Sequence, residues 1–361
     1  MPITMKEIAA IAGVSRQAVA AALDNVGTSK VSEATRKKIL AIAREMNYVP
    51  NQSARSLKGA ASMTIGVYGV PYASVLSQCF FNEMSLFLDR HGYNLMASYG
   101  LTCETAEQAV RRLIARSVDG IIVTTQYNPF TRWNLPPMPA VFTPPGYIPG
   151  CDIVVDHAAG TAAAVKEIIT KGRKKFLYIM PDFFKNGNPY PNMEKFRGFQ
   201  EALSEAGMEG MKIHLSESDG DGDKLLARIR GMAPDVIFCS NDYFAGRLIH
   251  LLLSAGIKIP DDIMIVGYDG LAVCDLCAVP LTTVIQPLQK MAESVVDLLL
   301  QRIKAKNTSP EPAEIKLLPE FYPSASTGTK NNKSKTLPIY DSYSSLEANW
   351  NEHTQMGDVL L

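Results

Sequence analysis

Hydrophobic residues recur at two different spacings along the chain. Over roughly the first 50 residues they recur every three or four positions, as in Ile8 and Ile11 or Val19 and Leu23, which predicts short amphipathic helices. From residue 62 onward, short β-branched runs alternate with longer helical patterns, which is typical of parallel sheets covered by helices. The pattern therefore predicts a small helical head followed by an α/β body.

The head carries local signals for three helices. Thr4 followed by Glu7 forms a capping box that begins the first helix, and Gly13 ends it. Ser15 and Ser32 can each cap a further helix through the side-chain hydroxyl. The predicted helices cover residues 5–12, 16–23 and from Ser32 to about Asn47.

The first two predicted helices have the spacing of a helix-turn-helix that reads DNA. Ala9 is small where two helices would cross closely, Gly13 permits a left-handed turn, and Val19 anchors the second helix on the first. An ordinary helical hairpin fits the same spacing and is the alternative. In a DNA reader the second helix enters the major groove, where Arg pairs with guanine and Gln with adenine. The side chains left outward for this role are Arg16, Gln17, Ala18 and Ala21.

The body contains more strand signals than one sheet of its size would use. Nine predicted strands, with helices between many of them, therefore indicate two doubly wound lobes of parallel sheet. The predicted strands are 64–68, 93–98, 120–124, 140–143, 153–155, 176–179, 236–239, 264–268 and 283–285. The predicted helices include 79–90, 106–116, 160–170, 193–206, 224–231 and 245–255.

Composition and charge refine this picture. The chain has 361 residues, of which 47% are hydrophobic and 20% charged, and these values exclude a disordered protein. Its net charge is zero, yet residues 1–60 hold nine Lys and Arg against four Asp and Glu, a local charge of +5. The remainder must then carry −5. A basic head on a neutral chain favours contact with nucleic acid through the head alone.

The sequence shows neither a secretory signal nor a run of the roughly 20 apolar residues needed to span a bilayer. Its six cysteines are scattered through a chain large enough to fold without disulfides, which fits reduced thiols. We therefore expect a cytoplasmic protein.

Three segments of the head resemble the lactose/galactose repressor (LacI/GalR) family of bacterial transcription regulators. They are TMKEIAAIAGVSRQAVAAAL at 4–23, VSEATR at 31–36 and NYVPNQSARSL at 47–57. The resemblance implies DNA contacts by head residues Thr4, Ser15, Arg16, Gln17, Ala18, Ala21, Lys30, Ser32, Thr35 and Arg36. Two departures leave the operator sequence open: residues 24–30 are about two longer than the usual family turn, and Ala21 stands where the lactose repressor has a base-contacting arginine.

The segment after the head resembles the family's hinge helix, which folds only on operator DNA. Pro50 can open such a helix, and residues 51–58 are short and polar enough to be disordered alone. Leu57 matches the residue that wedges into the central minor-groove step, and the alternative is a linker residue that touches the body. The hinge residues predicted to contact DNA are Asn51, Ala54, Leu57 and Lys58.

The body resembles the family's effector domain, which has the periplasmic-binding-protein-like fold. The matching motifs include DGIIV at 119, VVDHAAG at 154, EKFRGFQEAL at 194, SND at 240, IVGYD at 265 and PLTTVIQP at 280–287. The resemblance implies three chain crossings between the lobes, near 158–162, 285–288 and 317–322, and a small-molecule effector in the cleft between them. A sugar is the first expectation for that effector, followed by purines.

Five body residues are candidates for effector contact. Asp269 ends an apolar strand and its carboxylate can accept two hydroxyl hydrogen bonds, while Asn241 can donate and accept at once. Lys195 stands where many family members have an arginine, so it keeps the charge and loses the bidentate fork. Tyr72 and Gln126 lie near strand ends that would face the same cleft. Helix caps for Asn241 and Asp269, and a solvated charge for Lys195, are the alternatives.

Other constellations argue against an enzyme or a metal site. Cys274 and Cys277 have the spacing of half a zinc site, but no second ligand pair exists, so a pair of buried or loop thiols is expected. His157 is expected to cap the following helix. The sequence lacks the glycine-rich phosphate loops and the G-x-S-x-G nucleophile elbow. We therefore expect no metal, no cofactor and no catalysis.

The predicted organisation is a helix-turn-helix domain at 1–49, a hinge at 50–61, a two-lobed effector and dimerisation domain at 62–330, and a polar, disordered tail at 331–361. Leu337, Leu346 and Leu360 form no heptad seam, which favours a homodimer over a tetramer. The expected function is sequence-specific repression, with operator affinity set by the effector. A solute-binding protein without DNA function and a sugar- or nucleotide-processing enzyme are the alternatives.

Overall fold

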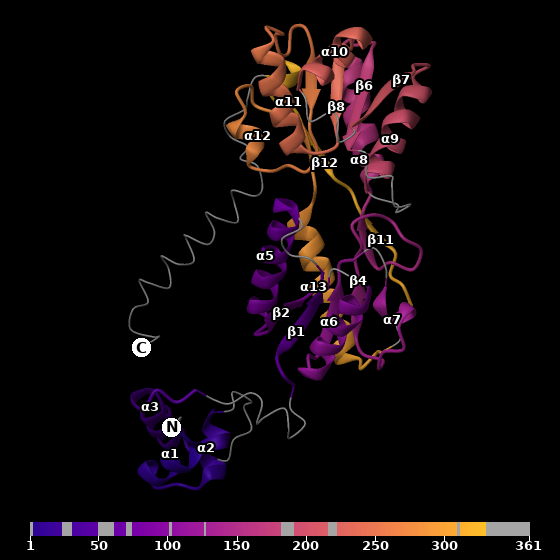
Figure 1. Ribbon diagram of the computed structural model, residues 1–361. Helices are drawn as coiled ribbons and strands as arrows, with labels where there is room; N and C mark the ends of the chain where they lie inside the picture. Colours follow the sequence, from indigo (N-terminus) through magenta and orange to yellow (C-terminus); the bar gives the residue numbers. More distant parts are fainter. Residues whose placement is uncertain are drawn as a thin grey trace. The chain divides into compact units, whose positions relative to one another are not determined.

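The computed structural model describes residues 3–23, 31–49, 61–69, 74–100, 103–125, 128–181, 191–215, 222–308 and 311–329. The chain divides into two compact units, with the boundary between Ser62 and Met63, and each is considered by itself (Figure 1). None of the helices in the described ranges combines the length and the apolarity that crossing a bilayer requires.

The first unit is built from three helices, α1 (Met5–Ala12), α2 (Arg16–Leu23) and α3 (Glu33–Glu45). The predicted capping box is present, since the Glu7 carboxylate accepts hydrogen bonds from both the backbone N–H and the hydroxyl of Thr4, at 2.7 and 2.9 Å. Gly13 ends α1 with a φ of 69°, a left-handed conformation that glycine adopts without strain. All three helices were predicted. The third was expected to end near Asn47, and it ends two residues earlier, at Glu45.

The first lobe of the second unit is a parallel four-stranded sheet in the order β2-β1-β3-β4. Alternate residues of its strands point to opposite faces. Ile65, Val67 and Ile122 face one apolar cluster with α5 and α13, and Tyr68 and Ile121 face another with α6. The bounds are β1 (Thr64–Tyr68), α5 (Val75–Arg90), β2 (Asn94–Ser98), α6 (Cys103–Ala115), β3 (Gly120–Val123), α7 (Pro129–Arg132), β4 (Ala140–Phe142) and α13 (Leu288–Lys304).

The second lobe repeats this plan with the strand order β7-β6-β8-β9, again all parallel. Helices α10 and α11 cover one face of the sheet, and α8 and α9 cover the other (Figure 1). The bounds are α8 (His157–Thr170), β6 (Phe176–Pro181), α9 (Pro191–Glu205), β7 (Gly210–Leu215), α10 (Gly222–Met232), β8 (Val236–Cys239), α11 (Asp242–Ser254), β9 (Met264–Val266) and α12 (Val273–Leu276).

The chain passes between the lobes three times, with the second and third passages at the places that the resemblance implied and the first a few residues before the expected 158–162. The first passage leads from β5 (Ile153–Val155) into α8, and the second from β10 (Thr283–Ile285) into α13. The third joins β11 (Ile315–Leu317), which pairs with β5, to β12 (Glu320–Tyr322), which pairs with β10. A short 3₁₀ helix at Ala325–Thr327 follows.

All nine predicted strands are present, within three residues at either end. Three others were missed, β7, β11 and β12. The body helices begin two to four residues before their predicted starts, because caps such as Ser74 and Asn241 stand ahead of the first apolar residue. The predicted hinge at 50–61 and tail at 331–361 fall almost wholly outside the described residues.

Candidate functional site

The three helices of the first unit are held together by one small apolar core. Ile8, Val19 and Ile39, one from each helix, are fully buried. The Lys38 ammonium also donates to the Ala12 carbonyl oxygen at 3.0 Å, which fastens α3 to the last turn of α1. Val19 therefore anchors α2 on α1, as the helix-turn-helix interpretation requires.

The beginning of α2 is the exposed part of this arrangement. Ser15, Arg16 and Gln17 are exposed, whereas Ala18 and Ala21 are half-buried. The Ser15 hydroxyl oxygen accepts a hydrogen bond from the Ala18 N–H at 3.1 Å and so caps the helix, as predicted. The exposed start of α2 thus presents a guanidinium and an amide, the two groups best suited to reading guanine and adenine in a major groove.

The other hydroxyls of the head also occupy helix starts. The Ser32 oxygen accepts from the Thr35 N–H at 3.3 Å, and the two hydroxyls lie 2.8 Å apart. Thr4, hydrogen-bonded to Glu7, is exposed and lowers the pKa of that carboxyl below its usual value. Hydroxyls and N–H groups at helix N-termini are common partners of DNA phosphates. Arg36, half-buried one residue beyond Thr35, adds a positive charge to this group.

Several predicted contact residues lie outside the described part of the chain. They are Lys30, Asn51, Ala54, Leu57 and Lys58 among the DNA contacts, and Tyr72 and Gln126 among the effector contacts.

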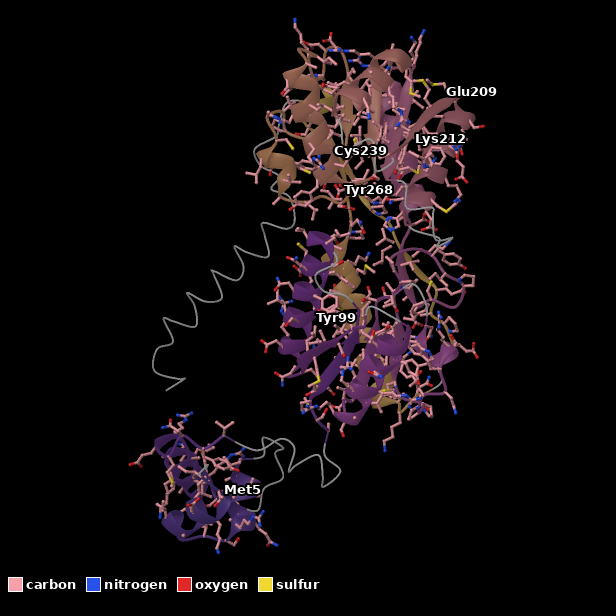
Figure 2. The ribbon with its side chains drawn as sticks, viewed as in Figure 1. Met5, Tyr99, Glu209, Lys212, Cys239 and Tyr268 are labelled. Carbon is pink, nitrogen blue, oxygen red and sulfur yellow. The ribbon has the colours of Figure 1, made fainter. Side chains whose placement is uncertain are left out.

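In the second unit, polar side chains gather at the carboxyl edge of the second sheet. The Lys195 ammonium of α9 donates to the Ser240 carbonyl oxygen at 2.9 Å and lies 3.4 Å from Asp269 Oδ1. Gln286 also donates to Asp269 Oδ1, at 2.8 Å. Figure 2 shows the neighbouring Tyr268 at this edge, away from Glu209 at the start of β7.

Lys195 and Asp269 form an ion pair whose side chains are only 5% and 10% exposed. Burial raises the pKa of Asp269, and the Lys195 charge works against that rise. The second carboxylate oxygen, Oδ2, has no hydrogen-bond partner among the described residues. The alternative interpretation of Lys195 as a solvated charge is therefore excluded, and the structure brings Lys195 and Asp269 together as partners.

Asp269 also has an unusual backbone. Its φ is 120°, in a region that non-glycine residues rarely adopt. Hydrogen bonds from its N–H to the Val284 carbonyl oxygen and from the Gln286 N–H to its own carbonyl oxygen, at 2.9 and 3.2 Å, hold it there. Such strain persists only where the surroundings fix it, and it is concentrated at functional sites.

Asn241 serves as a helix cap. Its side-chain oxygen accepts from the Phe244 N–H at 2.8 Å at the start of α11, so this oxygen is already committed. The side chain is half-buried, and its amide nitrogen remains as the group that could contact a ligand. The cap alternative and a ligand contact are thus compatible at this residue.

Four residues of this cluster were not predicted as contacts. Gln286, from the PLTTVIQP motif, and Tyr268, from IVGYD, stand within segments singled out for other reasons. The buried hydroxyls of Ser240 and Tyr178 have no hydrogen-bond partner among the described residues. Residues just after strands of a doubly wound sheet line ligand sites, and this rule could have pointed to Ser240.

His157 does not cap α8, and that prediction is wrong. The cap is Asp156, whose Oδ1 accepts from the Ala159 N–H at 3.0 Å. His157 is the first helical residue and is buried, with its ring nitrogens 2.9 Å from the Tyr268 hydroxyl oxygen and 3.1 Å from the Pro145 carbonyl oxygen.

A second buried carboxylate lies close to Asp269. Asp242 accepts from the Thr283 hydroxyl at 2.6 Å and from the Leu271 N–H at 2.8 Å. Burial, with the Asp269 charge as a second cause, raises the pKa of Asp242 to about 7. Because it holds the segment after Asp269, Asp242 acts as a support for the cluster.

Among the described side chains, His, Cys, Asp and Glu residues form no group of three or more that could hold a metal ion. Cys274 and Cys277 are free thiols, one buried and one half-buried, as predicted. Burial raises the pKa of both.

Two family models match the chain. Residues 4–51 match bacterial regulatory proteins of the lacI family, and residues 165–327 match a periplasmic binding protein-like domain. Among curated proteins, the HTH-type transcriptional repressor PurR of Photobacterium profundum is 30% identical over 323 residues, covering 84% of this chain and 93% of that protein. PurR of Vibrio vulnificus is 29% identical over 316 residues, with 84% and 92% covered.

Solved structures share the fold at lower identity. The lac repressor dimer bound to operator and the anti-inducer ONPF matches with a TM-score of 0.76 and 23% identity, covering 91% of this chain and 99% of that one. The complex of the transcriptional regulator CelR with cellobiose matches with a TM-score of 0.61 and 22% identity, covering 90% and 99%.

Proposed function

The chain belongs to the lacI family of bacterial regulatory proteins, and from that premise we propose how it works as a DNA-binding transcriptional repressor. Two copies bind a nearly palindromic operator, each placing α2 in a major groove, and a small molecule bound between the lobes sets the affinity. The predicted family, the two-lobed α/β fold and the regulatory rather than enzymatic function are confirmed by the relatives. Because its target is chromosomal DNA, we place the protein on the nucleoid in the bacterial cytoplasm.

One observation carries the DNA-reading part of the proposal. The core residues Ile8, Val19 and Ile39 set α2 across α1 and leave Arg16 and Gln17 exposed at its start. Base contacts are assigned to Arg16, Gln17, Ala18 and Ala21, and phosphate contacts to Thr4, Ser15, Lys30, Ser32, Thr35 and Arg36. Between the head at 1–49 and the effector domain at 62–330, residues 50–61 form the hinge, with Asn51, Ala54, Leu57 and Lys58 on the minor groove. The proposal assigns no role to the tail at 331–361.

The effector is a neutral molecule rich in hydroxyls, of which a sugar is the first expectation. Lys195 and Asp269 neutralise each other, so the site offers a ligand little net charge. What remains are polar groups suited to hydroxyls: Asp269 Oδ2, the Asn241 amide nitrogen, and the unpartnered hydroxyls of Ser240 and Tyr178. Tyr72 and Gln126 complete the proposed contacts from the first lobe.

Selection of bound duplexes from a randomised DNA pool tests the DNA-reading part. We expect the full-length protein to enrich a palindrome whose half-sites lie about one helical turn apart. A matched variant, Arg16→Ala with Gln17→Ala, should lose that consensus while keeping weak binding to all DNA. Enrichment of the same sequences by both proteins would overturn the assignment of α2 as the reading helix.

Thermal denaturation with a panel of D-ribose, D-xylulose, cellobiose and hypoxanthine tests the effector class. A sugar that binds only the folded protein should raise its melting temperature, and the rise should keep growing with the logarithm of the sugar concentration above its Kd. Stabilisation by hypoxanthine alone would replace the sugar with a purine as the effector class.

A further inference from the structure

His157 joins parts of both lobes through a single buried ring. It is 1% exposed, and its two ring nitrogens contact Pro145 and Tyr268, which are far apart in the sequence. Pro145 lies in the segment between β4 and β5 of the first lobe. Tyr268 lies just after β9 of the second lobe, directly before Asp269.

The hydrogen-bond roles around this ring follow from the partners. The Pro145 carbonyl oxygen can only accept, so His157 Nε2 carries a hydrogen and donates it at 3.1 Å. Burial, together with the nearby Lys195 charge, lowers the pKa of His157 to about 3, so the ring is neutral at physiological pH. A neutral ring has one donor and one acceptor. Nδ1 therefore accepts the Tyr268 hydroxyl hydrogen at 2.9 Å.

Tyr268 is in turn part of the ion-pair cluster. The Lys195 ammonium lies 3.9 Å from the centre of the Tyr268 ring, the arrangement of a cation–π contact. The same ammonium donates to the Ser240 carbonyl oxygen and pairs with Asp269. An unbroken series of contacts thus runs from the Pro145 carbonyl through His157 and Tyr268 to Lys195.

A second contact joins the same segment of the first lobe to α9. The Tyr147 N–H donates to the Glu194 carboxylate at 3.3 Å, and Glu194 immediately precedes Lys195. Residues 143–151 therefore contact the second lobe at two points. One contact reaches Tyr268 through His157, and the other reaches Glu194, the residue before Lys195.

We propose that His157 is a positioning residue that couples residues 143–151 of the first lobe to Lys195 and Asp269 through the Tyr268 hydroxyl. A change in the separation of the lobes breaks or restores the bond to Pro145. The Tyr268 ring and the ammonium above it then shift, and the site changes its affinity for a hydroxyl-rich ligand. This use of the coupling rests on the proposed function, whereas the coupling itself does not.

Ring ¹⁵N NMR of the full-length protein tests the hydrogen-bond roles without operator or effector. We expect His157 to show the neutral Nε2–H form from about pH 5 to 8, and Tyr268→Phe to shift its Nδ1 resonance only. The titratable groups around the ring and its hydroxyl partner are Lys195, Tyr268, Asp269, Glu194, Asp156 and Tyr178. Titration of His157 near 6.5, or the Nδ1–H form, would overturn the proposal.

Hydrogen exchange of peptides covering 143–152 tests the coupling. His157→Asn keeps an acceptor near Tyr268 but is too short to reach Pro145, and His157→Phe removes both bonds. Each should speed exchange in this segment by about twofold to tenfold, the range expected for one lost hydrogen bond. Tyr268→Phe, which removes a single buried oxygen, should also speed it, by less.

His91→Asn is the matched control, because the ring of His91, the C-cap of α5, bonds only to the Phe87 carbonyl oxygen of that helix among the described residues. It should leave the 143–152 peptides unchanged. Equal exchange in wild type, His157→Asn and Tyr268→Phe would overturn the coupling. Failure to select DNA would overturn the proposed function and leave these results unaffected, so the two failures are distinguishable.

Discussion

Arg302 and Asp152, which are 150 positions apart, meet through two hydrogen bonds of 2.7 and 2.6 Å, and both side chains are 7% exposed. Arg302 also donates to the Ala140 carbonyl oxygen, and Asp152 accepts from the Phe142 and Ala313 N–H groups. The pair thus ties α13 to β4 and to the segment before β11. It fastens the last turn of α13 to the rest of the first lobe.

Arg302→Met should destabilise the protein by about 3–5 kcal/mol, because it leaves the Asp152 carboxylate buried without its cation. The measurement is urea denaturation at neutral pH. Arg111→Met is the control, since the side chains of the Arg111–Glu107 pair are 50% and 34% exposed and the pair should contribute less than about 1 kcal/mol. Equal losses for the two variants would contradict the structural role assigned to Arg302.

The buried pair of Lys195 and Asp269 should show strong energetic coupling. Lys195→Met and Asp269→Asn each leave one polar partner buried, so each is expected to cost about 3–5 kcal/mol. The double variant should cost less than the two together, by roughly 1–3 kcal/mol. The exposed pair Lys166–Glu205 provides the matched cycle and should couple by less than about 1 kcal/mol. Additive losses at Lys195 and Asp269 would argue against their pairing.

The stability of the protein should depend on pH through His157. Burial lowers the pKa of His157 to about 3 in the folded state, while an unfolded imidazole titrates near about 6.5. The unfolded chain therefore binds more protons between these values. The contribution of neutral His157 is fully present above about pH 6.5 and is lost as pH falls toward 3.

The free energy of unfolding of wild type minus that of His157→Asn isolates this dependence, because Asp242 and all other groups are common to both proteins. Denaturation from about pH 4.5 to 7.5 should give a difference that rises up to about pH 6.5 and then stays constant. A difference independent of pH would mean that His157 keeps its ordinary pKa in the folded protein.

Two single substitutions in the head should separate base reading from phosphate binding. Gln17→Ala should relax base preference at one symmetric position of the operator and cost roughly 1–3 kcal/mol there. Arg36→Ala should weaken binding to all sequences alike and reduce the salt dependence by about one unit of slope. Anisotropy titrations on matched and altered duplexes measure both. Equal losses on every duplex for both variants would refute the assigned roles.

The fold was largely predictable where each element carries its own pattern. The buried strand Thr64–Tyr68 was predicted with its observed ends. Strand Gly210–Leu215 was missed because it lies at a sheet edge, where only Ile213 is buried and the apolar pattern is weak. The three-residue strand Ile315–Leu317 pairs with Ile153–Val155, and a partner so distant in sequence leaves no local signal.

The candidate site was predictable as a set of residues but not as an arrangement. Asp269, Asn241 and Lys195 follow from their motifs, yet the pairing of Lys195 with Asp269 depends on how α9 packs on the sheet, against β6 and β7. His157 was misassigned because Asp156, one residue earlier, supplies the cap and turns the imidazole inward. Its partners, Pro145 and Tyr268, become neighbours only after both lobes have formed.

Reciprocal linkage between operator and effector tests the central claim most directly. The selected operator and the panel compound that raises the melting temperature are titrated together, and each affinity is measured with and without the other. The account predicts that the compound changes operator affinity by the same factor, about 5- to 150-fold, by which operator changes the affinity for the compound. A factor of one in both directions would contradict control of DNA binding by a ligand between the lobes.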